Sequence, residues 1–246
     1  MKTKKITALS LIAAGCGGIA LGLRQMLYAT GLDGRDLLLR NHPLDLACWG
    51  MTAVLALVLL LALRKTEWSG EYADAFPASL PGAVGTIAAM GGSISLAFQA
   101  MEAISDKMTL LWTILAFAAA VCFAVTAGYR LRGKQPTIVF HGIICLFFCI
   151  HMICQYRTWS SNPQVADYEF ALLACVMLAL TALQRVIFDA GLGKPRSFLF
   201  TSVMAVFFCF ASLIGPEYKV FYLYGGVWAF ANLLPPPRRE AKPEEV

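Results

Sequence analysis

Residues 51–63 read MTAVLALVLLLAL, and Thr52 is the one polar side chain in this run. With the residues that precede it from position 44, it makes a largely apolar segment of about 20 positions, the length that a helix needs to cross a hydrocarbon core. Lipid offers no hydrogen-bond partners, so the backbone of such a segment must satisfy its polar groups internally. The stretch therefore predicts a transmembrane helix over residues 44–63.

Apolar blocks of this kind recur along the whole chain of 246 residues, of which 59% are hydrophobic and 14% charged. Soluble domains carry about 25% charged residues, so the composition excludes a water-soluble enzyme, a disordered tail and a nucleic-acid-binding domain. The blocks are continuously apolar, whereas barrel strands would alternate. We predict an all-α, polytopic integral membrane helix bundle with eight transmembrane helices. The expected spans are 6–23, 44–63, 82–101, 108–128, 137–154, 168–188, 197–214 and 218–234.

The connections between these blocks are too short to form a separate soluble domain. We therefore expect a single transmembrane helical domain over residues 1–234. Three prolines at 235–237 end the last block, and residues 235–246 are expected to form a short flexible cytoplasmic tail. Any function must then lie within the bundle or on its short loops.

The lysines and arginines indicate the orientation of the bundle. If the N-terminus is cytoplasmic, fourteen of the twenty lie on the cytoplasmic side and six lie outside. The outer six are Arg24, Arg35, Arg40, Lys107, Arg157 and Lys219. Cytoplasmic loops carry the excess of positive charge, so both termini are predicted to be cytoplasmic. The expected location is a cell membrane, the cytoplasmic membrane of a bacterium.

The first residues leave an alternative open. MKTKK followed by ITALSLIAAG is similar to a secretory signal, and the run AAGC that ends at Cys16 resembles a bacterial lipoprotein cleavage site. However, Ala13 stands where that site usually has a branched apolar residue, and the apolar stretch continues to Leu23. We expect a retained first helix. Cleavage before Cys16 would instead leave seven spans and a lipid anchor.

Small residues recur every fourth position in three of the blocks, a spacing that gives one flat helix face. These sets are Ala14, Gly18 and Gly22; Gly85, Ala89 and Ser93; and Ala116, Ala120, Ala124 and Gly128. We expect the faces to support close packing within the chain. A homodimer interface is the alternative.

Polar and aromatic residues gather at the predicted outer ends of several spans. The candidate ligand-binding residues are Asp45, Trp49, Gln99, Glu102, Trp112, His151, Arg157, Trp159 and Glu169. If these ends converge, they form an outward-facing cup whose carboxylates and rings suit a zwitterionic or cationic solute. The alternative is structural, because Trp and Tyr favour membrane interfaces and Arg157 could pin its turn through Glu169 or Asp167.

The fifth block contains the candidate metal ligands. His141, Cys145 and Cys149 are spaced by four and share one helix face, and imidazole and thiolate bind zinc, copper or haem iron. A fourth ligand would have to come from another span, with Cys175 or Cys209 as the options. The alternative is a hydrogen-bonded histidine beside small packing residues, and we predict no cofactor.

The functional prediction depends on the charged residues and enzyme motifs that the spans lack. No charged residue lies at the predicted centre of a span, which argues against a proton pump with a buried carboxylate relay. Intramembrane protease, hydrolase and nucleotide-binding motifs are absent from the sequence, so we do not expect an enzyme.

The leading prediction is a small-solute permease or a solute-binding membrane subunit. One alternative is an accessory or sensor protein that docks a partner through the loop at 64–81. Another is a metal- or haem-binding redox protein that uses His141, His151 and the nearby cysteines. The expected partners are the lipid bilayer, a small-molecule solute and either a second copy or another membrane protein, with no nucleic acid.

Overall fold

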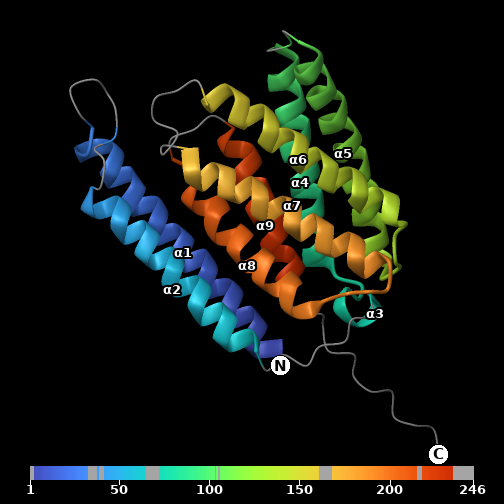
Figure 1. The fold of residues 1–246 in the computed structure, drawn as a ribbon. Coiled ribbons are helices and arrows are strands. Elements are labelled where there is room, and N and C mark those ends of the chain that lie inside the picture. Colours follow the sequence, from blue (N-terminus) through green and yellow to red (C-terminus); the bar gives the residue numbers. More distant parts are fainter. Residues whose placement is uncertain are drawn as a thin grey trace, which may run out of the picture.

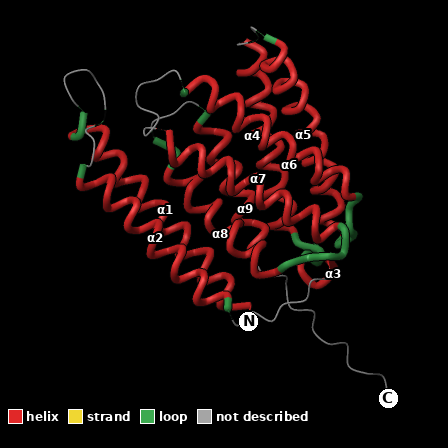
Figure 2. The backbone as a smooth tube through the Cα atoms, in the orientation of Figure 1, coloured by secondary structure: helices red, strands yellow, loops and turns green. Residues whose placement is uncertain are grey.

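The computed structural model of the chain is all-helical (Figures 1 and 2). It describes residues 3–32, 38, 42–64, 72–102, 104, 106–160, 168–214 and 218–234. Within these ranges there are eight helices of 15 residues or more, one single-turn helix, and no strand. The predicted tail at 235–246 lies outside the described residues.

Each of the eight predicted spans corresponds to one helix, which confirms the predicted fold class. The helices are α1 (Thr3–Thr30), α2 (Pro43–Leu63), α4 (Leu80–Glu102), α5 (Lys107–Arg132), α6 (Ile138–Trp159), α7 (Glu169–Asp189), α8 (Pro195–Ala211) and α9 (Lys219–Leu233). The single turn α3 (Tyr72–Ala75) precedes α4. The largest boundary difference is at α1, which continues seven residues beyond the predicted end at Leu23 to Thr30.

Six of the helices are long and apolar enough to cross a membrane, whereas α8 and α9 are shorter. At 1.5 Å per residue, 17 and 15 residues extend only about 25 and 22 Å. Both lie inside the bundle, where α8 contacts α1, α2, α7 and α9, and α9 also contacts α4 and α7. Every residue at positions 201–209 of α8 is buried. Because protein rather than lipid surrounds these two helices, they need not match the full hydrocarbon thickness.

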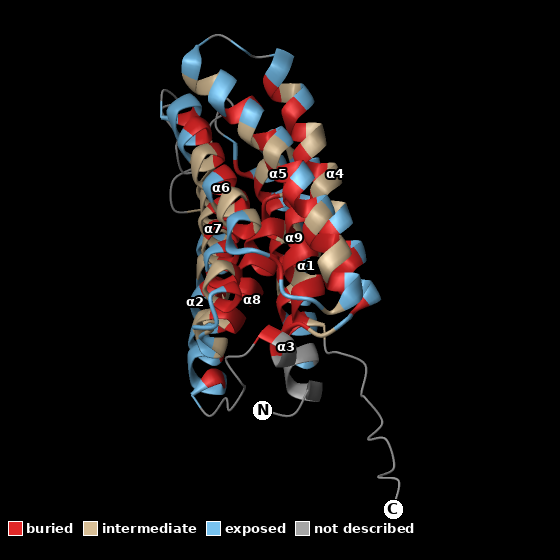
Figure 3. Cartoon of the chain, turned by 90° about the vertical axis from the view of Figure 1, so that its right-hand side faces the viewer, coloured by how far each residue is buried: buried red, intermediate tan, exposed pale blue. Residues whose placement is uncertain are grey.

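The outer surface of the bundle is strongly apolar. Leu57 and Leu61 of α2 are each more than half exposed, and large apolar side chains are also exposed on α1, α4 and α5. The buried residues occupy the centre of the bundle (Figure 3). A surface of this kind is unstable in water and suits contact with lipid hydrocarbon. The chain is thus a helical membrane protein.

The eight long helices alternate in direction. The end where α1 begins is also the end where α2, α5, α7 and α9 finish (Figure 1). We call it the inner end, following the charge distribution, and the opposite end the outer end. At the inner end α5 stops at Gly133, whose φ of 63° is left-handed and whose N–H donates to the carbonyl of Arg130.

Small residues bring helices together, but not always on the predicted face. A Cβ at Gly85 would collide with Ala231, so this face of α4 packs against α9 within the chain, as expected. In α1 the two glycines of the predicted stripe do not pack within the chain. Gly18 and Gly22 have no neighbouring atom within 4 Å, whereas Gly17 lies against α8. In α5 the stripe is buried at Ala116 and Ala120 and exposed at Ala124.

Candidate functional site

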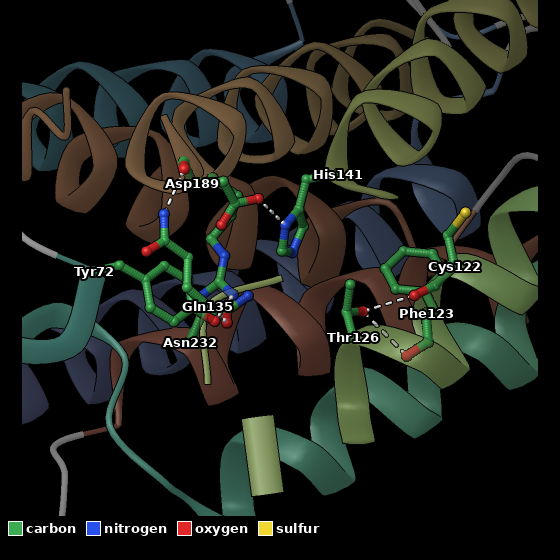
Figure 4. Close-up of polar contacts among 9 residues, drawn as sticks. Tyr72, Cys122, Phe123, Thr126, Gln135, His141, Asp189 and Asn232 are labelled. Atoms are coloured by element: carbon green, nitrogen blue, oxygen red, sulfur yellow. Dashed lines mark hydrogen bonds and ion pairs between the residues drawn. The ribbon is translucent and has the colours of Figure 1, made fainter. Parts of the chain in front are cut away.

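Among the buried polar side chains at the inner end are five from four different helices, of which Figure 4 labels His141, Asp189 and Asn232. They are Arg130 of α5, His141 of α6, Arg185 and Asp189 of α7, and Asn232 of α9, and none is more than 5% exposed. Buried charged groups are costly unless they are paired, and they can mark a functional site. We call these five residues the inner cluster.

Arg185 occupies the middle of the inner cluster. Its Nη1 donates to Oδ1 of Asn232 and its Nη2 to the hydroxyl of Tyr72, both at 3.4 Å. Its guanidinium carbon lies 3.6 Å from the centre of the Phe76 ring. Its Nε has no hydrogen-bond partner among the described residues. The hydrogen bonds are long, so Arg185 is held mainly by stacking and enclosure.

Arg130 approaches the same aromatic ring. Its guanidinium carbon lies 5.2 Å from the Phe76 centroid, and its Nη1 donates to the carbonyl of Pro77 at 2.9 Å. The side chain passes over Gly82, where a Cβ would lie 2.5 Å from the Arg130 Nε. A glycine at position 82 therefore leaves the room that this buried arginine occupies.

The segment 72–79, which contains α3, covers the inner cluster. Phe76 is fully buried, and its ring centre lies 5.2 Å from those of Phe188 and Phe198. Ser79 donates its N–H to the carbonyl of Arg130 at 3.2 Å, which ties the segment to the end of α5. Part of the loop predicted to dock a partner is thus packed against the bundle. Residues 65–71 of that loop lie outside the described residues.

The carboxylate of Asp189 is paired with His141. Its Oδ2 lies 2.5 Å from Nδ1 of His141, and both side chains are buried. Gln135 donates to the backbone carbonyl of Asp189, which fixes the end of α7 against the start of α6. Asp189 is the one buried Asp or Glu among the described residues. The inner cluster therefore holds two guanidinium groups against a single carboxylate.

Several buried polar atoms around the inner cluster lack a hydrogen-bond partner among the described residues. They are Nε of Arg130 and Arg185, Oδ1 of Asp189, Oε1 of Gln184 and Nδ2 of Asn232. Leaving a buried polar atom unsatisfied costs about 1–3 kcal/mol. The two arginine Nε atoms and Nδ2 of Asn232 are donors, and with the excess of positive charge they suit an anion that carries several acceptor oxygens, whereas Oδ1 of Asp189 and Oε1 of Gln184 need a donor.

The sequence contains a pattern that predicts buried charges at this site, but a count of lysines and arginines for topology does not reveal it. Arg130 and Arg185 are among the fourteen basic residues that the sequence places on the cytoplasmic side, because each lies near a helix end. However, Arg185 and Asp189 fall on the same face of α7 as Leu178 and Ala182, and that face is buried. A charged residue in phase with the apolar face of a helix predicts a buried charge.

The residues of the predicted outer cup fall on separate parts of the bundle. Asp45 and Trp49 lie on α2, and the Trp49 ring packs against Phe170 of α7 with centroids 5.2 Å apart. The α2 helix contacts α1 and α8, and Figure 1 places it on the opposite side of the bundle from α4 and α5. These two residues are therefore remote from Gln99 and Glu102 of α4.

Trp112 and His151 are brought together, with ring centroids 5.4 Å apart. His151 is fully buried and also contacts Phe221 at 4.4 Å and Tyr218 at 6.0 Å. Neither ring nitrogen of His151 has a hydrogen-bond partner among the described residues. This part of the predicted cup is an enclosed aromatic cluster.

The other cup residues make local contacts. Arg157 donates to the Asp106 carboxylate at 2.8 Å, with both side chains exposed. The backbone N–H of Thr109, the Thr109 hydroxyl and Arg157 all donate to Asp106 and hold the pKa of that carboxyl well below its usual range. The rings of Trp159 and Tyr168 are stacked at 4.4 Å.

At the ends of α4 and α7 the cup residues are less buried. Gln99 donates to Ser95 within α4 at 3.2 Å, Glu102 is exposed, and Glu169 is half-buried. A ligand-binding role for the outer residues stays a prediction.

The predicted metal ligands lie along the face of α6 that contacts α7. His141 pairs with Asp189, and the Cys145 thiol donates to the carbonyl of Ala179 at 3.5 Å. Cys149 is half-buried and is not part of a disulfide bond. Across the part of the chain that the structure describes, no three His, Cys, Asp or Glu side chains are grouped so that they could hold a metal ion.

No family model, curated protein or solved structure matches the chain.

Proposed function

We propose that this membrane protein binds a small anionic solute at the inner cluster, as a permease or as the solute-binding subunit of a membrane complex. One observation carries the proposal. Arg130 and Arg185 are both buried against Phe76, while the one buried carboxylate beside them is paired with His141.

Electrostatics favours an anion over the zwitterionic or cationic solute expected for the outer cup. Burying a charged side chain costs several kcal/mol even after the protein relaxes, unless a counter-charge is close. Carboxylate and phosphate groups accept paired hydrogen bonds from the planar guanidinium fork. An anion that contacts the Nε atoms of Arg130 and Arg185 would supply both the missing charge and the missing acceptors.

The surroundings of the inner cluster support entry of the anion from the inner end of the bundle. On that side it is covered by segment 72–79, of which α3 is a single turn. Toward the outer end the core is filled by rings, with Trp228 centred 5.6 Å from Phe123 and 5.9 Å from Phe148. Displacing the short cover is a smaller change than parting these rings, so we assign binding to the inner side. Transport would require a second state in which the rings separate.

Thermal unfolding of the detergent-purified protein tests the proposal with phosphate, sulfate, succinate, glutamate, choline and glycine betaine as probes. An anion that binds the inner cluster raises the melting temperature, because a ligand at 100 times its Kd stabilises the folded state by about 2.7 kcal/mol. We expect Arg185→Gln and Arg130→Gln to abolish that rise. Arg132→Gln is the matched control, since Arg132 is exposed on the same helix as Arg130.

Two results would overturn the proposal. One is an anion-dependent rise that persists in both buried-arginine variants. The other is a rise confined to choline or glycine betaine and removed by Glu169→Gln, which would favour the outer residues.

A further inference from the structure

A cleft of about 300 Å³ lies at the inner end between α2 and α8. It is lined by Leu60, Leu63, Arg64, Arg196, Ser197 and Phe200. The cleft is on a different face of α8 from the inner cluster. Phe198 packs against Phe76, whereas Arg196 and Phe200 face α2. The cleft is therefore a separate feature, and an inference from it does not depend on the proposed function.

The charged residues in the described lining of the cleft are both arginines. Arg64 follows the last residue of α2, and Arg196 is in the first turn of α8. The lining contains no Asp or Glu, and neither arginine forms an ion pair within the part of the chain that the structure describes. A cation in the first turn of a helix is disfavoured by the helix dipole, so Arg196 in particular would be stabilised by an anion.

The remaining lining is apolar and continues onto the lipid-facing surface. Leu63 and Phe200 form part of the wall. Leu60 is 57% exposed and adjoins Leu57 and Leu61, which are exposed to a similar degree. The cleft thus joins two guanidinium groups to an apolar surface that a lipid chain can cover.

We infer that this cleft binds one anionic phospholipid of the inner leaflet. Its phosphate contacts Arg64 and Arg196, and an acyl chain lies along Leu60 and Phe200. Charge complementarity selects the headgroup, because basic pockets between transmembrane helices on the cytoplasmic side recognise anionic lipids. The apolar wall selects a lipid over a free anion, because a phosphate ion alone would leave that wall without a partner.

Native mass spectrometry of the full-length protein in detergent tests this inference. The protein is incubated with phosphatidylglycerol or with phosphatidylcholine of the same acyl chains. We expect one phosphatidylglycerol to be retained in preference to phosphatidylcholine. Arg64→Gln and Arg196→Gln should each lower retention about fivefold, the effect of one interfacial basic residue. Arg132→Gln removes an exposed inner-end charge away from the cleft and should leave retention unchanged.

A second variant separates a lipid from a free anion. Ser197→Trp fills the cleft and keeps both arginines, so phosphatidylglycerol should be lost. Inorganic phosphate should not displace the lipid from the unsubstituted protein. Equal retention of the two lipids, undiminished retention in Arg64→Gln and Arg196→Gln, or displacement by inorganic phosphate would each overturn the inference.

Discussion

Two guanidinium groups and one aromatic ring set the chemistry of the inner cluster at the scale of single residues. A desolvated cation–π contact contributes about 2 kcal/mol, whereas burying an ion costs several kcal/mol. Phe76 therefore offsets only part of the cost of burying Arg130 and Arg185 against it. The remaining cost is the physical reason for expecting an anion between them.

Gly82→Ala tests the position of Arg130 without removing its charge. The added methyl would lie 2.5 Å from Nε and 3.2 Å from Nη2 of Arg130, so the guanidinium must shift. We expect the variant to fold and to lose at least half of the anion-dependent rise in melting temperature. Gly128→Ala is the control, because nothing lies within 4 Å of a Cβ there. An unchanged anion response in Gly82→Ala would contradict the assigned position.

Replacing each of two buried histidines by phenylalanine should change the free energy of unfolding in opposite directions. His151 has no hydrogen-bond partner among the described residues, so His151→Phe removes unsatisfied polar atoms and should raise the free energy of unfolding by about 1 kcal/mol. His141→Phe strips Asp189 of its partner and should lower it by about 3 kcal/mol. Chemical unfolding of both variants in detergent measures the two changes in free energy. A destabilising His151→Phe that also abolishes ligand binding would contradict this expectation and support His151 as a site residue.

At the scale of the helix, the lengths of the apolar blocks predicted the helices well. The faces on which the helices pack were predicted less well. The predicted span at 44–63 differs from α2 by one residue, because no lysine, arginine or proline interrupts that run. The prediction for α1 stopped at Leu23 because Arg24 follows. Arg24 is nevertheless buried, with its guanidinium carbon 4.7 Å from the Phe170 ring centre. A sequence does not show that a distant aromatic ring will cover an arginine.

Adjacent glycines in α1 show which face packs against α8. A Cβ at Gly17 would lie 2.8 Å from the Phe210 Cβ and 3.1 Å from the Phe207 carbonyl, whereas Gly18 faces open space. We expect Gly17→Ala to lower the free energy of unfolding by about 1–3 kcal/mol through overpacking. Gly18→Ala should be tolerated, because alanine favours the helix. If Gly18→Ala costs as much as Gly17→Ala, the predicted Ala14, Gly18 and Gly22 stripe would be the packing face after all.

At the scale of the whole molecule, composition and block length were sufficient to predict a helical membrane bundle. They could not show that α8 and α9 lie inside it, since a central helix and a lipid-facing helix are equally apolar in sequence. Nor could they show that segment 72–79 folds back over the inner end, which depends on Phe76 meeting Phe188 and Phe198. The inner cluster exists only once these distant segments meet.

The bundle therefore has a covered, positively charged cluster of side chains at one end and a core filled with aromatic rings toward the other. We propose that an anion occupies the inner cluster. Mass spectrometry of small molecules extracted from the gently purified protein tests this claim most directly. We expect one anionic compound at close to one per chain from the unsubstituted protein and from Arg132→Gln, and none from Arg185→Gln. Equal recovery of that compound from Arg185→Gln, or extracts from the unsubstituted protein that contain no stoichiometric anion, would contradict the account.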